Sequence, residues 1–274
     1  MKLLTPLIAL LLLASPLARA ADQPKLPPGE KEARERLNAS PRHGEWVEIP
    51  VEGSDAKLKA FVVYPEVKDK APVVIVIQEI FGMTDWIRSV ADQLAAEGFI
   101  AVAPDLLSGP AGKGTDAAGD RSAVMKAVSG LDPKMVTTML NATRDYALKL
   151  PSASGKSACI GFCWGGGTSF RYATEQPDLN ACVVYYGPPP SPAAMEKIKC
   201  PVLGNYGGAD NRISGTVPAT EAKMKELGKS YSPNIYEGAG HGFLRQQDGR
   251  NGANQKAADE AWPKTINFLK ENTK

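Results

Sequence analysis

Residues 160–167 read Ile160-Gly161-Phe162-Cys163-Trp164-Gly165-Gly166-Gly167. They have the form G-x-C-x-G, the pattern of a nucleophile elbow with cysteine where serine more often stands. A short apolar strand ends at Ile160, and a helix is expected to start near Thr168. The flanking glycines permit a strained turn, and the N–H groups of the new helix are expected to favour the thiolate of Cys163. A glycine-rich turn around an ordinary buried cysteine is the alternative.

Strands and helices are expected to alternate on both sides of this motif. Strands are predicted at 46–51, 58–64, 72–78, 99–103, 157–160, 182–186, 201–206 and 234–236. Helices are predicted at 84–97, near 121–128, and at 134–150, 168–174, 218–227 and 255–269, the last kinked or split by Pro263. This alternation predicts one three-layer α/β domain, with a mostly parallel sheet and helices on both faces.

The chain begins with the features of a secretory signal peptide. A basic start precedes an apolar run, and Ala18-Arg19-Ala20 has the form of a cleavage site, so cleavage is predicted after Ala20. We expect a signal peptide at residues 1–20, an extended or partly helical arm at 21–44, and the α/β domain at 45–274. The expected location is periplasmic or secreted.

Composition limits the classes of partner. The net charge of +2, without a concentrated basic patch, argues against nucleic acid. No segment after the signal peptide is apolar and long enough to span a membrane. We expect a monomer that needs no cofactor. Cys182 and Cys200 could pair in an oxidising compartment, although buried free thiols are the simpler alternative.

A cysteine nucleophile needs a base and a group that orients the base. The chain has two histidines, and His43 precedes the first strand, where a surface role is expected. His241 follows the last predicted strand, and Asp210 follows the strand before it. The ends of parallel strands are where such sheets place their sites. The order Cys163, Asp210, His241 therefore predicts a catalytic triad, although His241 could be an ordinary loop residue and Asp210 a turn former.

The loop Gln78-Glu79-Ile80-Phe81-Gly82 follows the strand predicted at 72–78. In an elbow enzyme this loop supplies one oxyanion donor, and the residue after the nucleophile supplies another. These donors would be the backbone N–H groups of Ile80 and Trp164. Glu79 is unexpected there because its negative charge opposes the charge to be stabilised. Either it is a solvated loop residue or its charge has a regulatory role.

Four motifs together resemble the dienelactone hydrolase family of α/β-hydrolases. They are Gln78-Glu79-Ile80-Phe81-Gly82, Gly161-Phe162-Cys163-Trp164-Gly165-Gly166, Gly208-Ala209-Asp210 and Gly240-His241-Gly242-Phe243. They occur in the family's order, within similarity that extends over roughly residues 44–270. The resemblance implies an α/β-hydrolase fold and opening of an enol-lactone ester by Cys163, His241 and Asp210 through an acyl-thioester.

The resemblance also implies roles for charged residues near the nucleophile. In the family, the glutamate equivalent to Glu79 contacts the resting cysteine and moves when substrate binds. The best-known substrates carry a carboxylate held by two arginines, for which Arg245 and Arg121 are the candidates here. Arg245 lies four residues after His241, and Arg121 is assigned only by its distance before Cys163. Gly242 and Trp164 depart from the serine and leucine usual in the family, which puts the substrate in doubt more than the chemistry.

Other functional classes have weaker support. A small-molecule-binding protein on a retained hydrolase fold is the main alternative to an enzyme, and the intact triad argues against it. The lack of a C-x-x-C pair disfavours a thiol-redox role. Two distant histidines without clustered carboxylates disfavour a metal site.

Overall fold

The computed structural model describes residues 25–274. The predicted signal peptide at residues 1–20 and the start of the arm lie outside this part of the chain. Among the helices of residues 25–274, none is both long and apolar enough to cross a membrane.

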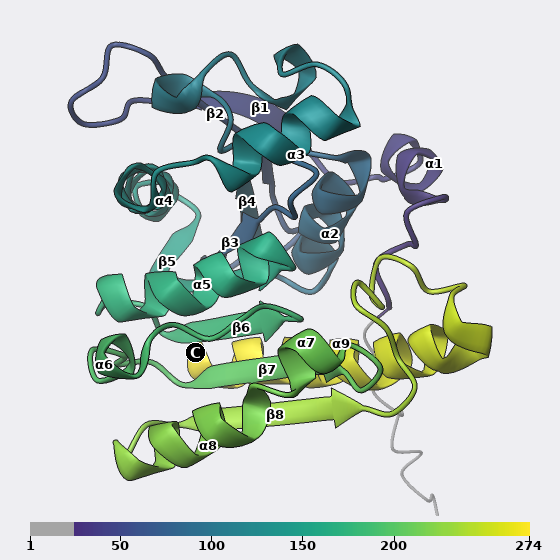
Figure 1. The fold of residues 1–274 in the computed structure, drawn as a ribbon. Helices are drawn as coiled ribbons and strands as arrows, with labels where there is room; N and C mark the ends of the chain where they lie inside the picture. Colours follow the sequence, from purple (N-terminus) through teal and green to yellow (C-terminus); the bar gives the residue numbers. More distant parts are fainter. Residues whose placement is uncertain (1–24) are drawn as a thin grey trace, which may run out of the picture.

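An eight-stranded sheet forms the centre of the molecule (Figure 1), in the order β1-β2-β4-β3-β5-β6-β7-β8. β2 pairs antiparallel with both β1 and β4, and all other neighbouring strands are parallel. The strands are β1 Gly44–Ile49, β2 Leu58–Val63, β3 Ala71–Ile77, β4 Ile100–Pro104, β5 Ala153–Phe162, β6 Ala181–Tyr185, β7 Val202–Gly207 and β8 Tyr231–Tyr236. The predicted mostly parallel α/β architecture is confirmed.

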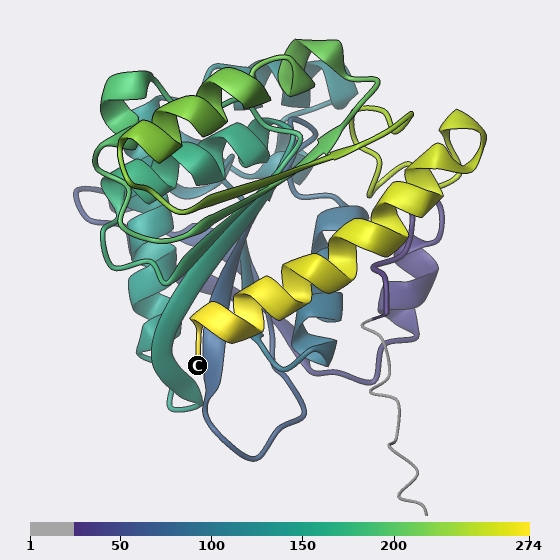
Figure 2. The ribbon, with the colours of Figure 1, turned by 90° about the horizontal axis from the view of Figure 1, so that it is seen from below.

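Helices cover both faces of the sheet, with α2 and α9 on one side and α4, α5 and α8 on the other (Figure 2). Because side chains alternate along a strand, Val74 and Val76 of β3 pack toward the first group, whereas Val73 and Ile75 pack toward the second. The helices are α1 Ala33–Asn38, α2 Asp85–Ala96, α3 Arg121–Ser129, α4 Pro133–Leu148, α5 Trp164–Glu175, α6 Pro192–Met195, α7 Asn211–Ser214, α8 Val217–Glu226 and α9 Ala253–Asn272. Three short 3₁₀ turns are η1 Gly109–Ala111, η2 Thr115–Ala117 and η3 Arg250–Gly252.

Several element boundaries differ from the prediction. α5 begins at Trp164 rather than near Thr168, because a single residue makes the turn from β5. β8 begins at Tyr231, three residues earlier than expected, because it pairs with β7 from that residue onward. α6 and α7 were not predicted, since each is only one turn long.

Pro263 does not split the last helix. α9 continues through it from Ala253 to Asn272. The neighbouring side chains of Trp262 and Ile266 are fully buried against the sheet. Packing on both sides of the proline therefore outweighs the loss of one helical N–H donor.

The arm before β1 packs on the domain and is partly helical, as predicted for it. Its helix α1 lies against α2 (Figure 1). Trp86 of α2 donates its indole N–H to the carbonyl of Pro28 at 3.1 Å, and Arg42 Nε lies 3.0 Å from Asp92. The described part of the arm is thus held at both ends, and its middle is positioned near the carboxyl edge of the sheet.

Candidate active site

Cys163 occupies a strained turn between β5 and α5. Its φ of +56° lies in the range that residues with a side chain rarely adopt. Its own N–H donates to the carbonyl of Tyr185 at 3.1 Å, which ties the turn to the neighbouring strand β6. α5 crosses the sheet so closely that a Cβ at Gly165 would collide with the carbonyl oxygens of Ile77 and Gln78. The glycines of the motif are therefore required by backbone contact between elements.

Asp210 and His241 meet at the carboxyl ends of β7 and β8. Asp210 stands directly before α7, and His241 lies in the loop after β8. The His241 Nδ1 atom lies 2.6 Å from Asp210 Oδ2. The Asp210 side chain is 9% exposed and that of His241 33%, so the histidine ring is the more accessible of the two. This contact orients the ring and leaves Nε2 available for proton transfer.

The backbone N–H groups of Trp164 and Ile80 act on the thiol of Cys163, and both lower its pKa. These are the two donors predicted for the oxyanion site. The net pKa of Cys163 is nevertheless raised, because burial and the charge of Glu79 outweigh the two N–H groups. The helix N-terminus therefore favours the thiolate through the N–H of Trp164, as expected, but burial and Glu79 outweigh this effect in the resting protein. The donors are present, but the thiol is the stable form.

Glu79 is buried, with 1% of its surface exposed, so the solvated alternative for this residue is wrong. Its Oε2 lies 2.6 Å from Arg245 Nε, without the alignment of a hydrogen bond. Burial raises the pKa of Glu79 to about 7 even though Arg245 acts in the opposite direction. The negative charge of Glu79 in turn raises the pKa of the Cys163 thiol.

Arg245 and Arg121 lie on opposite sides of one carboxylate, that of Glu30 in the arm. Arg245 Nη1 pairs with Glu30 Oε2, and Arg121 Nη1 lies 3.9 Å from Glu30 Oε1. Both guanidinium groups also lie over the ring of Phe81, at 4.9 Å and 3.9 Å from its centroid. The structure thus brings together the two arginines that the family resemblance implied. We call Glu30, Glu79, Arg121 and Arg245 the charge cluster.

The side chain of Trp164, next to Cys163, adds an apolar surface to the site. It packs, with Ile80, against a small apolar group under α3 that consists of Leu107, Val124 and Val128. α3 also begins with Arg121 of the charge cluster. One short helix therefore contributes both an apolar wall and a positive charge next to the elbow.

Tyr186 was not predicted as a site residue. It follows β6 with a φ of +40° and is fully buried. Its ring meets the His241 ring edge-on at 5.1 Å, and its hydroxyl has no hydrogen-bond partner among the described residues. The only feature of the sequence that could have marked Tyr186 as a site residue was its place at the carboxyl end of a strand. That strand is apolar throughout, so its residues look like ordinary core residues.

The remaining predicted residues lie apart from this site. His43 is largely exposed and stacks on Tyr64, as expected of a surface residue. Cys182 and Cys200 are not bonded to each other, and both are buried free thiols. In residues 25–274, no group of three or more histidine, cysteine or acidic side chains is placed to bind a metal ion.

Comparison with known proteins agrees with this fold and its motifs. The sequence model of the dienelactone hydrolase family matches residues 58–273. A protein of Saccharolobus solfataricus named "Putative carboxymethylenebutenolidase" is 33% identical over 259 residues, which cover 83% of this chain and 99% of that protein. A protein of the same name from Salmonella typhimurium is 31% identical and covers 81% of this chain and 84% of its own length.

A solved structure supports the same assignment. The crystal structure of a "Putative Dienelactone Hydrolase" from Klebsiella pneumoniae superposes with a TM-score of 0.72 and 26% identity, over 84% of this chain and 99% of that one. The family model matches the chain from β2 to the end of α9, so the arm lies outside the matched residues. The chain belongs to the dienelactone hydrolase family.

Proposed function

We propose that this protein hydrolyses small esters or lactones through a cysteine nucleophile. Family membership makes the chain a hydrolase of ester or lactone bonds. The finer proposal assigns Cys163 as nucleophile, His241 as base and Asp210 as the residue that orients the base. It requires no cofactor.

The proposed reaction begins when His241 takes the proton of Cys163 and the thiolate attacks the substrate carbonyl. The backbone N–H groups of Ile80 and Trp164 then stabilise the tetrahedral oxyanion. The C–O bond breaks with His241 returning the proton to the leaving oxygen, which leaves an acyl-thioester on Cys163. His241 next activates a water molecule that releases the acid and restores the thiol.

One observation carries this proposal: Cys163 stands in a strained turn with a φ of +56°, where the N–H groups of Ile80 and Trp164 act on its thiol, and the neighbouring strands β7 and β8 end in a 2.6 Å Asp210–His241 contact. A structural cysteine would need neither the positive φ nor the pair of donors. Burial of Glu79 beside the sulfur further suggests that the thiol is held unreactive until substrate arrives.

Hydrolysis of p-nitrophenyl acetate and of a dienelactone by the wild type and by Cys163→Ala tests the proposal. We expect Cys163→Ala to lose at least about a thousandfold in kcat, because the nucleophile is removed. Cys159→Ala is the matched control, since Cys159 is a buried thiol of β5. Wild-type protein that hydrolyses neither compound would favour the small-molecule-binding alternative, and an active Cys163→Ala would refute the nucleophile.

We also propose that the protein is exported and loses residues 1–20. The support is the sequence pattern of a basic start, an apolar run and Ala18-Arg19-Ala20. Amino-terminal sequencing of protein recovered from the periplasm or medium should begin at Ala21. Recovery of the intact chain in the cytoplasm would contradict this location.

A further inference from the structure

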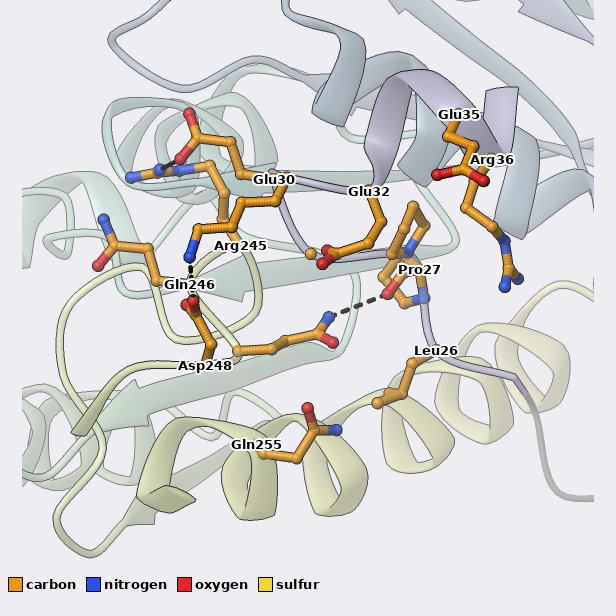
Figure 3. A pocket seen from close by; sticks show the side chains of 14 residues that line it. Leu26, Pro27, Glu30, Glu32, Glu35, Arg36, Arg245, Gln246, Asp248 and Gln255 are labelled. Carbon is orange, nitrogen blue, oxygen red and sulfur yellow. Dashed lines mark hydrogen bonds and ion pairs between the residues drawn. The ribbon is translucent and has the colours of Figure 1, made fainter. Parts of the chain in front are cut away.

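The two arginines near the nucleophile already hold a carboxylate of the protein itself. Glu30 reaches them from the arm, which lies before the first residue matched by the family model. Figure 3 shows Glu30 beside Arg245, at the edge of a pocket between the arm and α9. Of the residues predicted for the site, only Arg245 lines this pocket, whose volume is about 800 Å³.

Glu30 is fixed in place by the arm around it. Its backbone N–H donates to the carbonyl of Arg245 at 2.9 Å. Gln247 donates to the carbonyl of Pro27 at 2.9 Å, and Lys31 pairs with Asp248 at 2.6 Å. These contacts join three successive parts of the arm to the loop after His241. Glu30 is therefore a stable neighbour of Arg245 rather than a side chain that reaches it by chance.

The charges around Arg245 leave little attraction for a second anion. Its guanidinium is only 6% exposed and contacts two carboxylates, those of Glu30 and Glu79. Arg121 is 61% exposed, and its nearest carboxylate is also that of Glu30. An incoming carboxylate would have to displace the Glu30 carboxylate before it could bind both arginines.

We propose that Glu30 is a specificity-determining residue that occupies the arginine pair and restricts the site to uncharged esters or lactones. This inference rests on the proposed function, since it names the substrate class of the same site. The physical basis has two parts. The carboxylate of Glu30 repels a substrate carboxylate that approaches the arginines, and the positive charges of Arg121 and Arg245 are already matched by carboxylates of the protein.

Two esters of equal length test the inference: 4-nitrophenyl butyrate, which is uncharged, and mono-4-nitrophenyl succinate, which ends in a carboxylate. We expect the wild type to prefer the butyrate. Glu30→Gln should raise the ratio of kcat/KM for succinate over butyrate by at least about tenfold, because it removes the competing charge, leaves Arg121 without its carboxylate partner and leaves Arg245 with Glu79 alone. Glu32→Gln is the control, since it makes the same change of net charge on the same arm without a contact to Arg245.

The ratio separates the possible outcomes. An unchanged ratio in Glu30→Gln, or a wild type that already prefers the succinate ester, would overturn the inference while leaving the hydrolase intact. A change of equal size in Glu32→Gln would also overturn it, because the effect would then reflect net charge alone.

A binding measurement keeps the test independent of catalysis. Calorimetry with monomethyl succinate would compare Cys163→Ala with Cys163→Ala/Glu30→Gln. We expect the double variant to bind at least about tenfold more tightly. Equal affinities would refute the inference even if neither ester were hydrolysed. The absence of hydrolysis would separately refute the proposed function.

Discussion

The turn at Cys163 and the charge cluster lie side by side but are assembled in different ways. Around Cys163, backbone geometry sets the arrangement: a strained turn, two N–H donors and glycines where elements touch. Around Arg245, four charged side chains meet from the arm, the loop after β3, the start of α3 and the loop after β8. Backbone geometry therefore sets the surroundings of Cys163, whereas the charges beside it come from side chains that can change one at a time.

The largest effect is expected at the acid of the proposed triad. Asp210→Asn should keep the fold but lower kcat by roughly a thousandfold to ten-thousandfold, because the amide no longer holds His241 in the required tautomer. Steady-state kinetics with p-nitrophenyl acetate would measure this. Asp145→Asn is the control, since Asp145 is an exposed carboxylate of α4. A less than tenfold loss in Asp210→Asn would remove this residue from the mechanism.

The close backbone packing around Cys163 can be tested at Gly165. A Cβ at this position collides with backbone oxygens of β3 and the loop after it, so Gly165→Ala should cost at least about 3 kcal/mol of unfolding free energy. Gly130→Ala should change stability by less than about 0.5 kcal/mol, because its φ is −89° and its Cβ meets only ordinary contacts. Denaturant unfolding measures both. Equal unfolding free energies of Gly165→Ala and Gly130→Ala would contradict the close approach of α5 to β3.

Glu79 links the two regions and predicts a pH effect. Besides burial, the negative charge of Glu79 raises the pKa of Cys163. If Glu79 were neutral, less negative charge would offset the positive charge of Arg245. Both changes favour the thiolate, so Glu79→Gln should lower the midpoint of the pH profile of iodoacetamide labelling. A midpoint that stays or rises would show that Glu79 does not hold the thiol protonated.

The smallest effect is expected at Arg121. Its side chain is largely exposed and its contact with Glu30 is 3.9 Å long, so solvent screens most of this interaction. Arg121→Gln should change the succinate-to-butyrate ratio by less than about fivefold, whereas Arg245→Gln should change it more, because Arg245 is buried between two carboxylates. Equal changes in the two variants would mean that the arginines act as one unit.

Sequence reasoning located the elements well because the signals were local. The continuous β-branched run of β3 and the glycine that ends α2 are typical of their structures, and both elements were predicted within one or two residues. The predicted split at Pro263 does not occur, because Trp262 and Ile266 are buried against the sheet on either side of it. Tyr186 was missed for a similar reason: its role depends on which ring it meets in space.

The sequence alone determined the order and placement of Cys163, Asp210 and His241. Each follows a strand within a few residues, and parallel strands bring their carboxyl ends to one edge of the sheet. Only the tertiary structure decided the charges and the pKa around them. These are the raised pKa of the Cys163 thiol, the burial of Glu79 and the pairing of Glu30 with Arg245. Charge interactions depend on distance and on the exclusion of water, and Glu30 and Arg245 are separated by 215 positions in the chain, so no local pattern carries that information.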